Sequence, residues 1–209
     1  MVIKMQANIF GIKRLNINTD GDGITTLIGM FECPLNCEYC INNPIQQYVK
    51  YTIEELYNIV KVDRLYFKHT GGGICFGGHE PLLQQKFIIE FIKYVRKQGH
   101  DWKFTIETSL NVKLDSELLS YVDYMIVDIK TIDTSIYQDY TETKNLQMLF
   151  NLKHLAKWGG KKTIVVPTIP GYTNEQEIKE SVQALRRMGY KEEEIDTSLT
   201  YITSKEQMS

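Results

Sequence analysis

The sequence lacks several features that would place it in a specialised class of protein. Its 209 residues contain no run approaching the ~20 apolar residues of a membrane-spanning helix, and its start lacks the charged and then apolar pattern of a secretory leader. Neither sign of charge is in clear excess, because 24 Lys and Arg face 26 Asp and Glu. We therefore expect a cytoplasmic protein whose partners are neither membranes nor nucleic acids.

Cysteine is scarce, with four residues, and three of them fall within a span of eight. This distribution does not provide the spaced pairs of a disulfide framework. No repeat, low-complexity run or flexible linker divides the chain, and a hydrophobic content of 43% is enough for a globular core. The sequence predicts a single domain over residues 1–209 in a reducing compartment, with the clustered cysteines binding a metal.

What the sequence does contain is a repeated alternation of strand-like and helix-like segments. The expected strands are residues 24–31, 73–77, 102–107, 124–129, 163–166 and 198–203. Helical spacing of apolar residues, with capping boxes, Pro81 or a closing glycine, predicts helices that begin near Thr52, Pro81, Leu118, Leu149 and Thr173. Six such units predict an α/β fold with a parallel sheet, either open or closed into a complete or partial barrel.

The first expected strand is followed by a C-x3-C-x2-C loop formed by Cys33, Cys37 and Cys40. Three thiolates can hold a four-iron four-sulfur cluster and leave one iron open for another ligand. The alternative is a structural zinc ion with His69 or His79 as the fourth ligand, although such sites usually contain paired C-x2-C motifs. Cys75 lies inside an expected strand, and we interpret it as a small core residue.

Polar clusters also follow three other expected strands. Residues 76–84 contain glycines that let the backbone approach a ligand closely, and residues 107–109 and 128–130 supply carboxylates, hydroxyls and an amine. Each cluster alone is typical of an ordinary turn at the end of a strand. Since the carboxyl ends of parallel strands meet at one edge, we expect these clusters and the cysteine loop on the same rim.

The cysteine loop, with Tyr39 before its last cysteine, resembles the motif of the radical S-adenosylmethionine (radical SAM) superfamily. The segments around it resemble one branch, the activating enzymes of glycyl-radical enzymes, typified by pyruvate formate-lyase activating enzyme. The segments that carry this resemblance are residues 21–24, 33–42, 71–73, 77–84, 107–109, 127–130 and 166–171.

The resemblance implies a partial (β/α)6 TIM-like barrel in which Cys33, Cys37 and Cys40 hold a [4Fe-4S] cluster. The amino and carboxylate groups of S-adenosylmethionine (SAM) would bind its open iron. Reduction would then split SAM into methionine and a 5′-deoxyadenosyl radical, which in the activating enzymes removes hydrogen from a glycine of a large partner enzyme. A flavodoxin or ferredoxin is the implied electron donor.

The resemblance also assigns roles to individual residues. Those implied to bind SAM are Tyr39, Asn42, Gly77, Gly78, His79, Glu80, Thr108, Ser109, Lys130 and Pro167. Those implied to bind a monovalent cation beside SAM are Glu107, Thr108 and Asp128. Tyr39 and Asn42 would contact the adenine, Pro167 would lie under it, and the turn after Gly77 would support the amino group of the methionine half.

Three positions differ from the family pattern. His79 replaces a glycine, Val165 stands where many activating enzymes have arginine, and no histidine accompanies Tyr201. No further cysteine pairs follow the loop, so one cluster is expected. The main functional hypothesis is a radical SAM enzyme that generates a glycyl radical on a partner protein. Modification of a peptide or small molecule by the same chemistry is the alternative, and a zinc-stabilised binding module is a further one.

Overall fold

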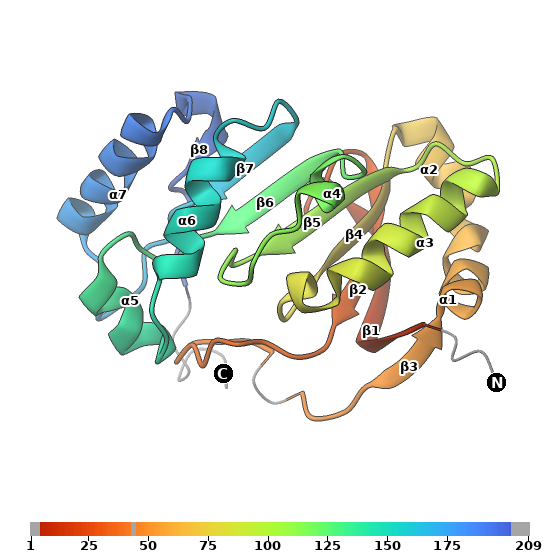
Figure 1. Cartoon of the computed structure of the whole chain (residues 1–209), viewed down its shortest axis with the longest axis horizontal. Coiled ribbons are helices and arrows are strands. Elements are labelled where there is room, and N and C mark those ends of the chain that lie inside the picture. The colour runs from red at the N-terminus through yellow and green to blue at the C-terminus, as the bar shows by residue number, and fades with distance from the viewer. Residues whose placement is uncertain (1–4, 43–44, 202–209) are drawn as a thin grey trace.

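One eight-stranded sheet organises the computed structural model, which describes residues 5–42 and 45–201 (Figure 1). The strand order is β3-β1-β2-β4-β5-β6-β7-β8, and its two ends do not meet, so the sheet is an open, partial barrel. The parallel strands are β2 (Ile24–Met30), β4 (Gly73–Gly78), β5 (Lys103–Thr108), β6 (Tyr124–Asp128), β7 (Lys161–Val165) and β8 (Ile195–Asp196). The predicted α/β class and parallel sheet are confirmed.

Helices connect the parallel strands. They are α1 (Ile53–Val60), α2 (Arg64–Thr70), α3 (Gln85–Lys97), α4 (Ser116–Leu119), α5 (Thr134–Thr141), α6 (Leu146–Leu155) and α7 (Glu175–Met188), with short 3-10 turns η1 (Lys61–Asp63), η2 (Pro81–Gln84) and η3 (Glu192–Glu194). The predicted capping box at Thr52 is present, with the hydroxyl of Thr52 accepting from the Glu55 amide.

The capping box predicted at Thr173 is wrong by one residue. Asn174 is the N-cap of α7, because its side-chain oxygen accepts from the amide of Gln176 at 2.7 Å while Glu177 accepts from the Asn174 amide at 2.9 Å. The hydroxyl of Thr173 instead accepts from the amide of Ile169 at 2.7 Å and belongs to the preceding turn.

Two antiparallel strands were not predicted. β1 (Gln6–Ile17) pairs with β2 and also with β3 (Val49–Thr52), which extends the sheet beyond its parallel part. The strand predicted at residues 198–203 is also wrong, because β8 lies earlier in the chain. The Asp196 carboxylate accepts from the Ser198 amide at 2.8 Å and turns the chain, and only an isolated bridge between Thr168 and Thr200 follows. Residues 202–203 lie outside the described part.

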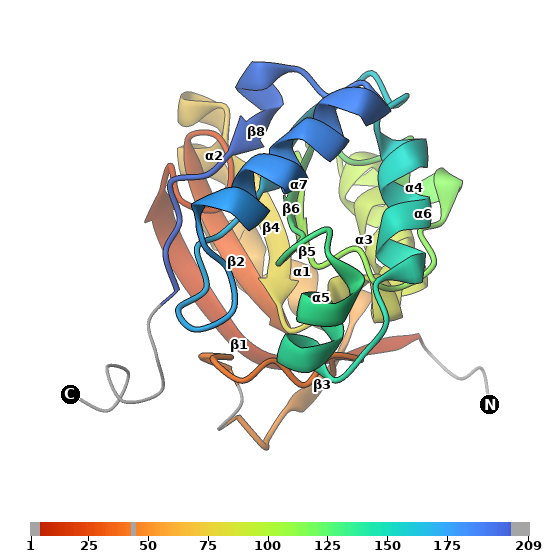
Figure 2. The same ribbon diagram turned by 90° about the vertical axis from the view of Figure 1, so that its left-hand side faces the viewer.

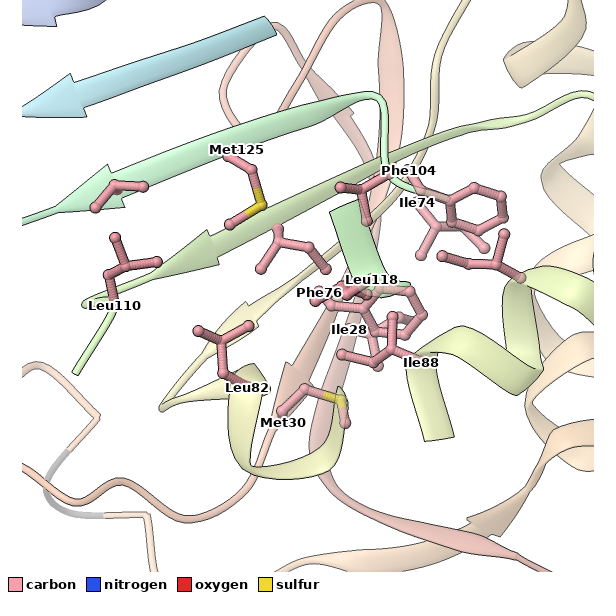
Figure 3. Packing of buried hydrophobic residues seen from close by; sticks show 14 of the residues in the cluster. Ile28, Met30, Ile74, Phe76, Leu82, Ile88, Phe104, Leu110, Leu118 and Met125 are labelled. Atoms are coloured by element: carbon pink, nitrogen blue, oxygen red, sulfur yellow. The ribbon is translucent and has the colours of Figure 1, made fainter. Parts of the chain in front are cut away.

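The main hydrophobic core lies between the sheet and the helices (Figure 3). Ile28, Ile74, Phe76 and Phe104 point from neighbouring strands toward this layer, and Ile88 meets them from α3. Burying side chains of this size contributes about 1.5–3 kcal/mol each. Cys75 alternates with Ile74 and Phe76 along β4 and is fully buried on the opposite face of the sheet.

The β1–β2 loop covers the amino end of that opposite face. An ion pair of 2.5 Å joins Lys161 in β7 to Asp22 in the loop. Gly21 has φ of 140° and packs so tightly that a Cβ would lie 2.6 Å from the hydroxyl of Thr105. The carboxyl ends of the strands are therefore the open side of the barrel. Among the described residues, no helix has the length and apolar character to cross a membrane.

Candidate active site

A cavity of about 460 Å³ opens at the carboxyl ends of the strands. It is lined by Cys37, Tyr39, Cys40, Ile41, Asn42, Gly78, Glu107, Asp128, Lys130, Tyr140, Leu199, Thr200 and Tyr201. The structure thus brings the cysteine loop together with the ends of β4, β5 and β6. Of the residues implied to bind SAM, Tyr39, Asn42, Gly78 and Lys130 line the cavity.

The cysteine loop rests against the carboxyl end of α5 (Figure 2). The amides of Asn36 and Glu38 donate to the carbonyls of Thr141 and Tyr140, at 3.0 and 3.3 Å. The Asn36 side chain also donates to the carboxylate of Glu142 at 2.8 Å. These contacts hold the loop by its backbone and by the Asn36 side chain, and none of them uses a cysteine thiol.

His79 connects the two ends of the cysteine loop. The Glu32 amide lies 3.2 Å from the Nδ1 atom of His79 and donates to it, so Nε2 carries the proton and donates to the Asn42 carbonyl at 3.1 Å. The imidazole also packs between Phe10 and Phe31, with ring centroids 5.1 and 5.5 Å away. Both ring nitrogens are engaged, and His79 does not line the cavity.

This placement bears on the zinc alternative. His79 has no free nitrogen for a metal. His69 lies in α2, at the amino end of β4, whereas the cysteines follow the carboxyl end of β2. Within the described residues no group of three His, Cys, Asp or Glu side chains is arranged around a single metal ion. Three thiols that each bind a different iron do not need to converge on one point, so this donor set fits an iron–sulfur cluster.

The thiol of Cys37 lies in an environment that favours its neutral form in the metal-free chain. Burial raises its pKa to about 11, although the positive charge of Lys130 acts in the opposite direction. A buried thiolate requires a positive partner, which a bound metal centre provides. Cys75 is fully buried, and burial likewise raises its pKa well above the ordinary value.

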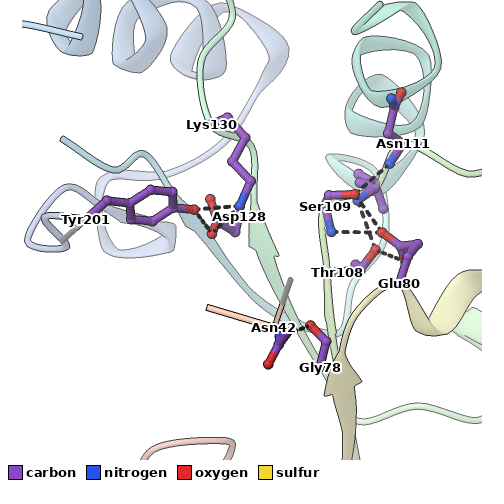
Figure 4. A network of polar contacts seen from close by, with 10 residues as sticks. Asn42, Gly78, Glu80, Thr108, Ser109, Asn111, Asp128, Lys130 and Tyr201 are labelled. Atoms are coloured by element: carbon purple, nitrogen blue, oxygen red, sulfur yellow. Dashed lines mark hydrogen bonds and ion pairs between the residues drawn. The ribbon is translucent and has the colours of Figure 1, made fainter. Parts of the chain in front are cut away.

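Asp128, Lys130 and Tyr201 form a polar triad on one wall of the cavity (Figure 4). The ammonium of Lys130 lies 2.8 Å from the carboxylate of Asp128 and 2.5 Å from the phenol of Tyr201, which in turn donates to Asp128. Burial lowers the pKa of Lys130, but Asp128 and Tyr201 raise it more, so the amine stays charged. The Oδ1 atom of Asp128 is buried with no hydrogen-bond partner among the described residues.

Glu80, Thr108 and Ser109 form a second polar group, which is turned away from the cavity (Figure 4). The hydroxyls of Thr108 and Ser109 each donate to the Glu80 carboxylate at 2.6 Å, and the Ser109 and Leu82 amides donate at 3.0 and 3.1 Å. Burial raises the pKa of Glu80, and these hydrogen bonds oppose that shift. The group ties the end of β4 to the end of β5 and so holds the turn at Gly78 in place.

Glu107 is the carboxylate that β5 presents to the cavity. Burial raises its pKa to about 7, and the negative charges of Asp20 and Asp128 add to the shift while Lys130 opposes it. A Cβ at Gly77 would lie 2.8 Å from its Oε2 atom, so a side chain there would displace this carboxylate. Of the residues implied to bind a cation, Glu107 and Asp128 line the cavity, whereas the hydroxyl of Thr108 is bonded to Glu80.

The remaining predicted contacts differ in position. The Asn42 side chain donates to the Gly78 carbonyl at 2.8 Å, which joins the cysteine loop to β4. Pro167 is buried beyond β7 and does not line the cavity. A second cavity, of about 490 Å³, shares Ile41, Asn42, Gly78 and Glu107 with the first. It continues along β1 and β2, so the site extends over the inner face of the sheet.

Sequence reasoning did not identify Tyr201 as a site residue. The family resemblance marks this position only by the absence of a histidine. The signal that could have identified Tyr201 is an aromatic hydroxyl near the end of the expected last strand. Its phenol bonds both Lys130 and Asp128.

The chain is similar to known proteins in sequence and in fold. The family model described as the radical SAM superfamily matches residues 27–185. The 4-hydroxyphenylacetate decarboxylase activating enzyme of Clostridium scatologenes is 35% identical over 155 residues, which cover 70% of this chain and 47% of that protein. The pyruvate formate-lyase-activating enzyme of Clostridium pasteurianum is 30% identical and covers 72% of this chain and 65% of its own length.

The chain therefore spans about half to two thirds of the length of these relatives. Among solved structures, SuiB of Streptococcus suis bound to S-adenosylmethionine superposes with a TM-score of 0.59 at 13% identity. That match covers 83% of this chain and 38% of SuiB and shows a shared fold. From the family model, the relatives and the fold together, the chain belongs to the radical SAM superfamily.

Proposed function

We propose that this chain is an activating enzyme that reductively cleaves SAM and generates a glycyl radical on a partner protein. The observation that carries the proposal is that Cys37 and Cys40 of the cysteine loop line one cavity with a charged amine and a carboxylate, those of Lys130 and Asp128. The two sequence relatives described above are named as activating enzymes, which supports a protein target.

Cys33, Cys37 and Cys40 would hold a [4Fe-4S] cluster. When bound, the cluster supplies the single electron that divides SAM into methionine and a 5′-deoxyadenosyl radical. The protein contributes position: the cysteine loop is fixed by α5 on one side and by His79 at its two ends. The electron itself would come from a low-potential flavodoxin or ferredoxin.

SAM would lie in the cavity between the cysteine loop and the triad. The charged amine of Lys130 complements the carboxylate of the methionine half, and the unpartnered Oδ1 of Asp128 is an acceptor for its amino group. Tyr39 and Asn42 lie on the adenine side, and the backbone at Gly78 approaches the ligand without a side chain. Glu107 and Asp128 are the carboxylates available to a monovalent cation beside SAM.

The substrate glycine would enter along the second cavity. Hydrogen transfer breaks one glycine C–H bond and forms one C–H bond on the 5′-carbon, so the products are 5′-deoxyadenosine and a glycyl radical. The second cavity shares four residues with the first and runs past Asp20 and Lys13 on the inner face of the sheet. This continuity is what a loop inserted by a large partner requires.

The experiment is anaerobic reconstitution with iron and sulfide, followed by reduction in the presence of SAM and a candidate glycyl-radical enzyme. Formation of 5′-deoxyadenosine together with the doublet of a glycyl radical in the electron paramagnetic resonance (EPR) spectrum supports the proposal. A different result would be 5′-deoxyadenosine together with a modified peptide or small molecule and no glycyl radical on any partner tested. That result would show that the proposed protein target is wrong and that the peptide or small molecule is the substrate. A colourless protein with one bound zinc would overturn the proposal.

A further inference from the structure

Two tyrosines lie on α5, the helix that contacts the cysteine loop, and their hydroxyls have no role in the site described so far. Tyr140 lines the cavity, and Tyr137 is buried in the main core. Tyr137 and Tyr140 are three residues apart, so they share one face of the helix. Tyr140 packs with Cys37 and Ile169 in a small cluster separate from the main core. The carbonyl of Tyr140 accepts from the Glu38 amide at 3.3 Å, so this face of α5 is in direct contact with the loop.

Both phenols are buried without a hydrogen-bond acceptor. The side chains of Tyr137 and Tyr140 are 0% and 1% exposed, and neither hydroxyl has a partner among the described residues. The nearby backbone amide of Tyr39 is a donor, so it does not accept the hydrogen of the Tyr140 phenol. An unpaired buried hydroxyl costs about 1–3 kcal/mol, so two such phenols on a helix beside the cavity call for a partner that a bound group can supply.

The surroundings of the two phenols show where such a ligand lies. Tyr140 lines the cavity together with Cys37 and Cys40, two of the cysteines that would hold the cluster. Tyr137 lies one turn earlier on α5, the helix whose end accepts from the Asn36 and Glu38 amides of the cysteine loop. The two tyrosines therefore lie on the helix that carries this loop.

We propose that Tyr137 and Tyr140 donate O–H···S hydrogen bonds to sulfur atoms of the bound cluster and raise its reduction potential. This inference rests on the proposed function. Hydrogen bonds to the sulfurs are one of the factors that set the potential of an iron–sulfur cluster. A donor stabilises the reduced cluster more than the oxidised one, because reduction adds negative charge to the acceptor.

The test uses the single variants Tyr137→Phe and Tyr140→Phe, their double variant and a matched control, Tyr190→Phe. Tyr190 is also buried, but its phenol already donates to the carbonyl of Leu152 at 2.8 Å, away from the cysteines. Each protein is measured without the cluster by urea denaturation. Each is then reconstituted, and the midpoint potential is measured by redox titration with EPR detection.

The α5 variants and the Tyr190→Phe control are expected to differ in opposite ways in the two measurements, the urea midpoint and the reduction potential. In the cluster-free protein, Tyr137→Phe and Tyr140→Phe leave the urea midpoint unchanged or higher. Tyr190→Phe lowers it, because the hydrogen bond from the phenol to the Leu152 carbonyl is lost and, among the described residues, only the Ala156 amide still donates there. In the reconstituted protein, Tyr190→Phe leaves the potential unchanged. The double variant lowers the ratio of reduced to oxidised cluster at a fixed potential about tenfold, a shift of about 59 mV for one electron.

A second measurement detects the proposed hydrogen bonds directly. Electron–nuclear double resonance of the reduced wild-type protein in H2O and D2O is expected to show exchangeable protons coupled to the cluster, which disappear in the double variant. A normal cluster with the same potential and the same exchangeable protons in all variants would overturn this inference and leave the proposed function standing. A wild-type chain that assembles no cluster would overturn both.

Discussion

Replacement of Glu80 tests how the ends of β4 and β5 are held together beside the cavity. In the Ala variant the Leu82 and Ser109 amides lose their acceptor inside the protein, at about 1–3 kcal/mol each, whereas the two hydroxyls can turn to other partners. Burial of the carboxylate opposes this loss, since it raises the pKa of Glu80. We expect Glu80→Ala to lower the free energy of unfolding by about 2–4 kcal/mol.

The Gln variant separates shape from hydrogen bonding. In Glu80→Gln the remaining side-chain oxygen can still accept two hydrogen bonds. The new NH2 group faces the backbone N–H of Ser109, and this contact between two donors costs about 1–2 kcal/mol. Because the folded-state pKa of Glu80 is raised, wild-type stability relative to Glu80→Gln is greatest at low pH and falls as the pH rises through that value.

The assay is urea unfolding of the cluster-free protein, monitored by circular dichroism at several pH values. The control is Glu90→Ala, which removes an exposed carboxylate from α3 and is expected to change stability by less than about 0.5 kcal/mol. A loss below about 1 kcal/mol in Glu80→Ala, or a Gln variant less stable than the Ala variant, would refute the reasoning.

The other predictions concern the cluster, SAM and the edge of the sheet. Cys37→Ala is expected to abolish cluster binding, measured as iron and sulfide content and visible absorbance, while Cys75→Ala, on a fully buried residue, leaves both unchanged. Equal iron in the two variants would contradict the assignment. Asp128→Ala is expected to weaken SAM binding more than tenfold in a direct titration without changing cluster content, and an unchanged affinity would remove Asp128 from the site. Burial raises the pKa of Glu194, but the Lys191 amide and the Lys162 ammonium together lower it more, so its pKa in the folded protein is below the ordinary value. Wild type is therefore expected to be more stable than Glu194→Gln at neutral pH, and this advantage disappears as the pH falls through the folded-state pKa of Glu194. An advantage that grows in acid would contradict this.

The parallel part of the fold was predictable because its strands and helices have distinct periods. β4 and β6 have buried apolar residues bounded by glycine or polar turns, and α1 has a complete capping box. β1 was missed because it combines polar residues, a glycine and register shifts along a strand that is only partly buried. Such a strand is stabilised by pairing with β2 and β3, which no local pattern reveals.

The site was predictable where the motif carries the chemistry, as at the cysteine loop, and not where side chains act through tertiary contacts. His79 follows β4 in the sequence, but its role in joining Glu32 to Asn42 depends on how the loop returns to the sheet. Tyr137 and Tyr140 lie in α5, a helix that the sequence did not predict, and only burial without a hydrogen-bond partner distinguishes them from ordinary core tyrosines. Burial and pairing are properties of the folded chain, so these residues could not be selected from the sequence.

The most direct test of the account is EPR of the anaerobically reconstituted and reduced protein with and without SAM, combined with a chromatographic assay for 5′-deoxyadenosine. The account predicts a cluster signal that changes when SAM is added and 5′-deoxyadenosine that forms only with reductant, SAM and intact Cys33, Cys37 and Cys40. A protein that contains zinc and no cluster signal, or a cluster whose spectrum and chemistry ignore SAM, would contradict it.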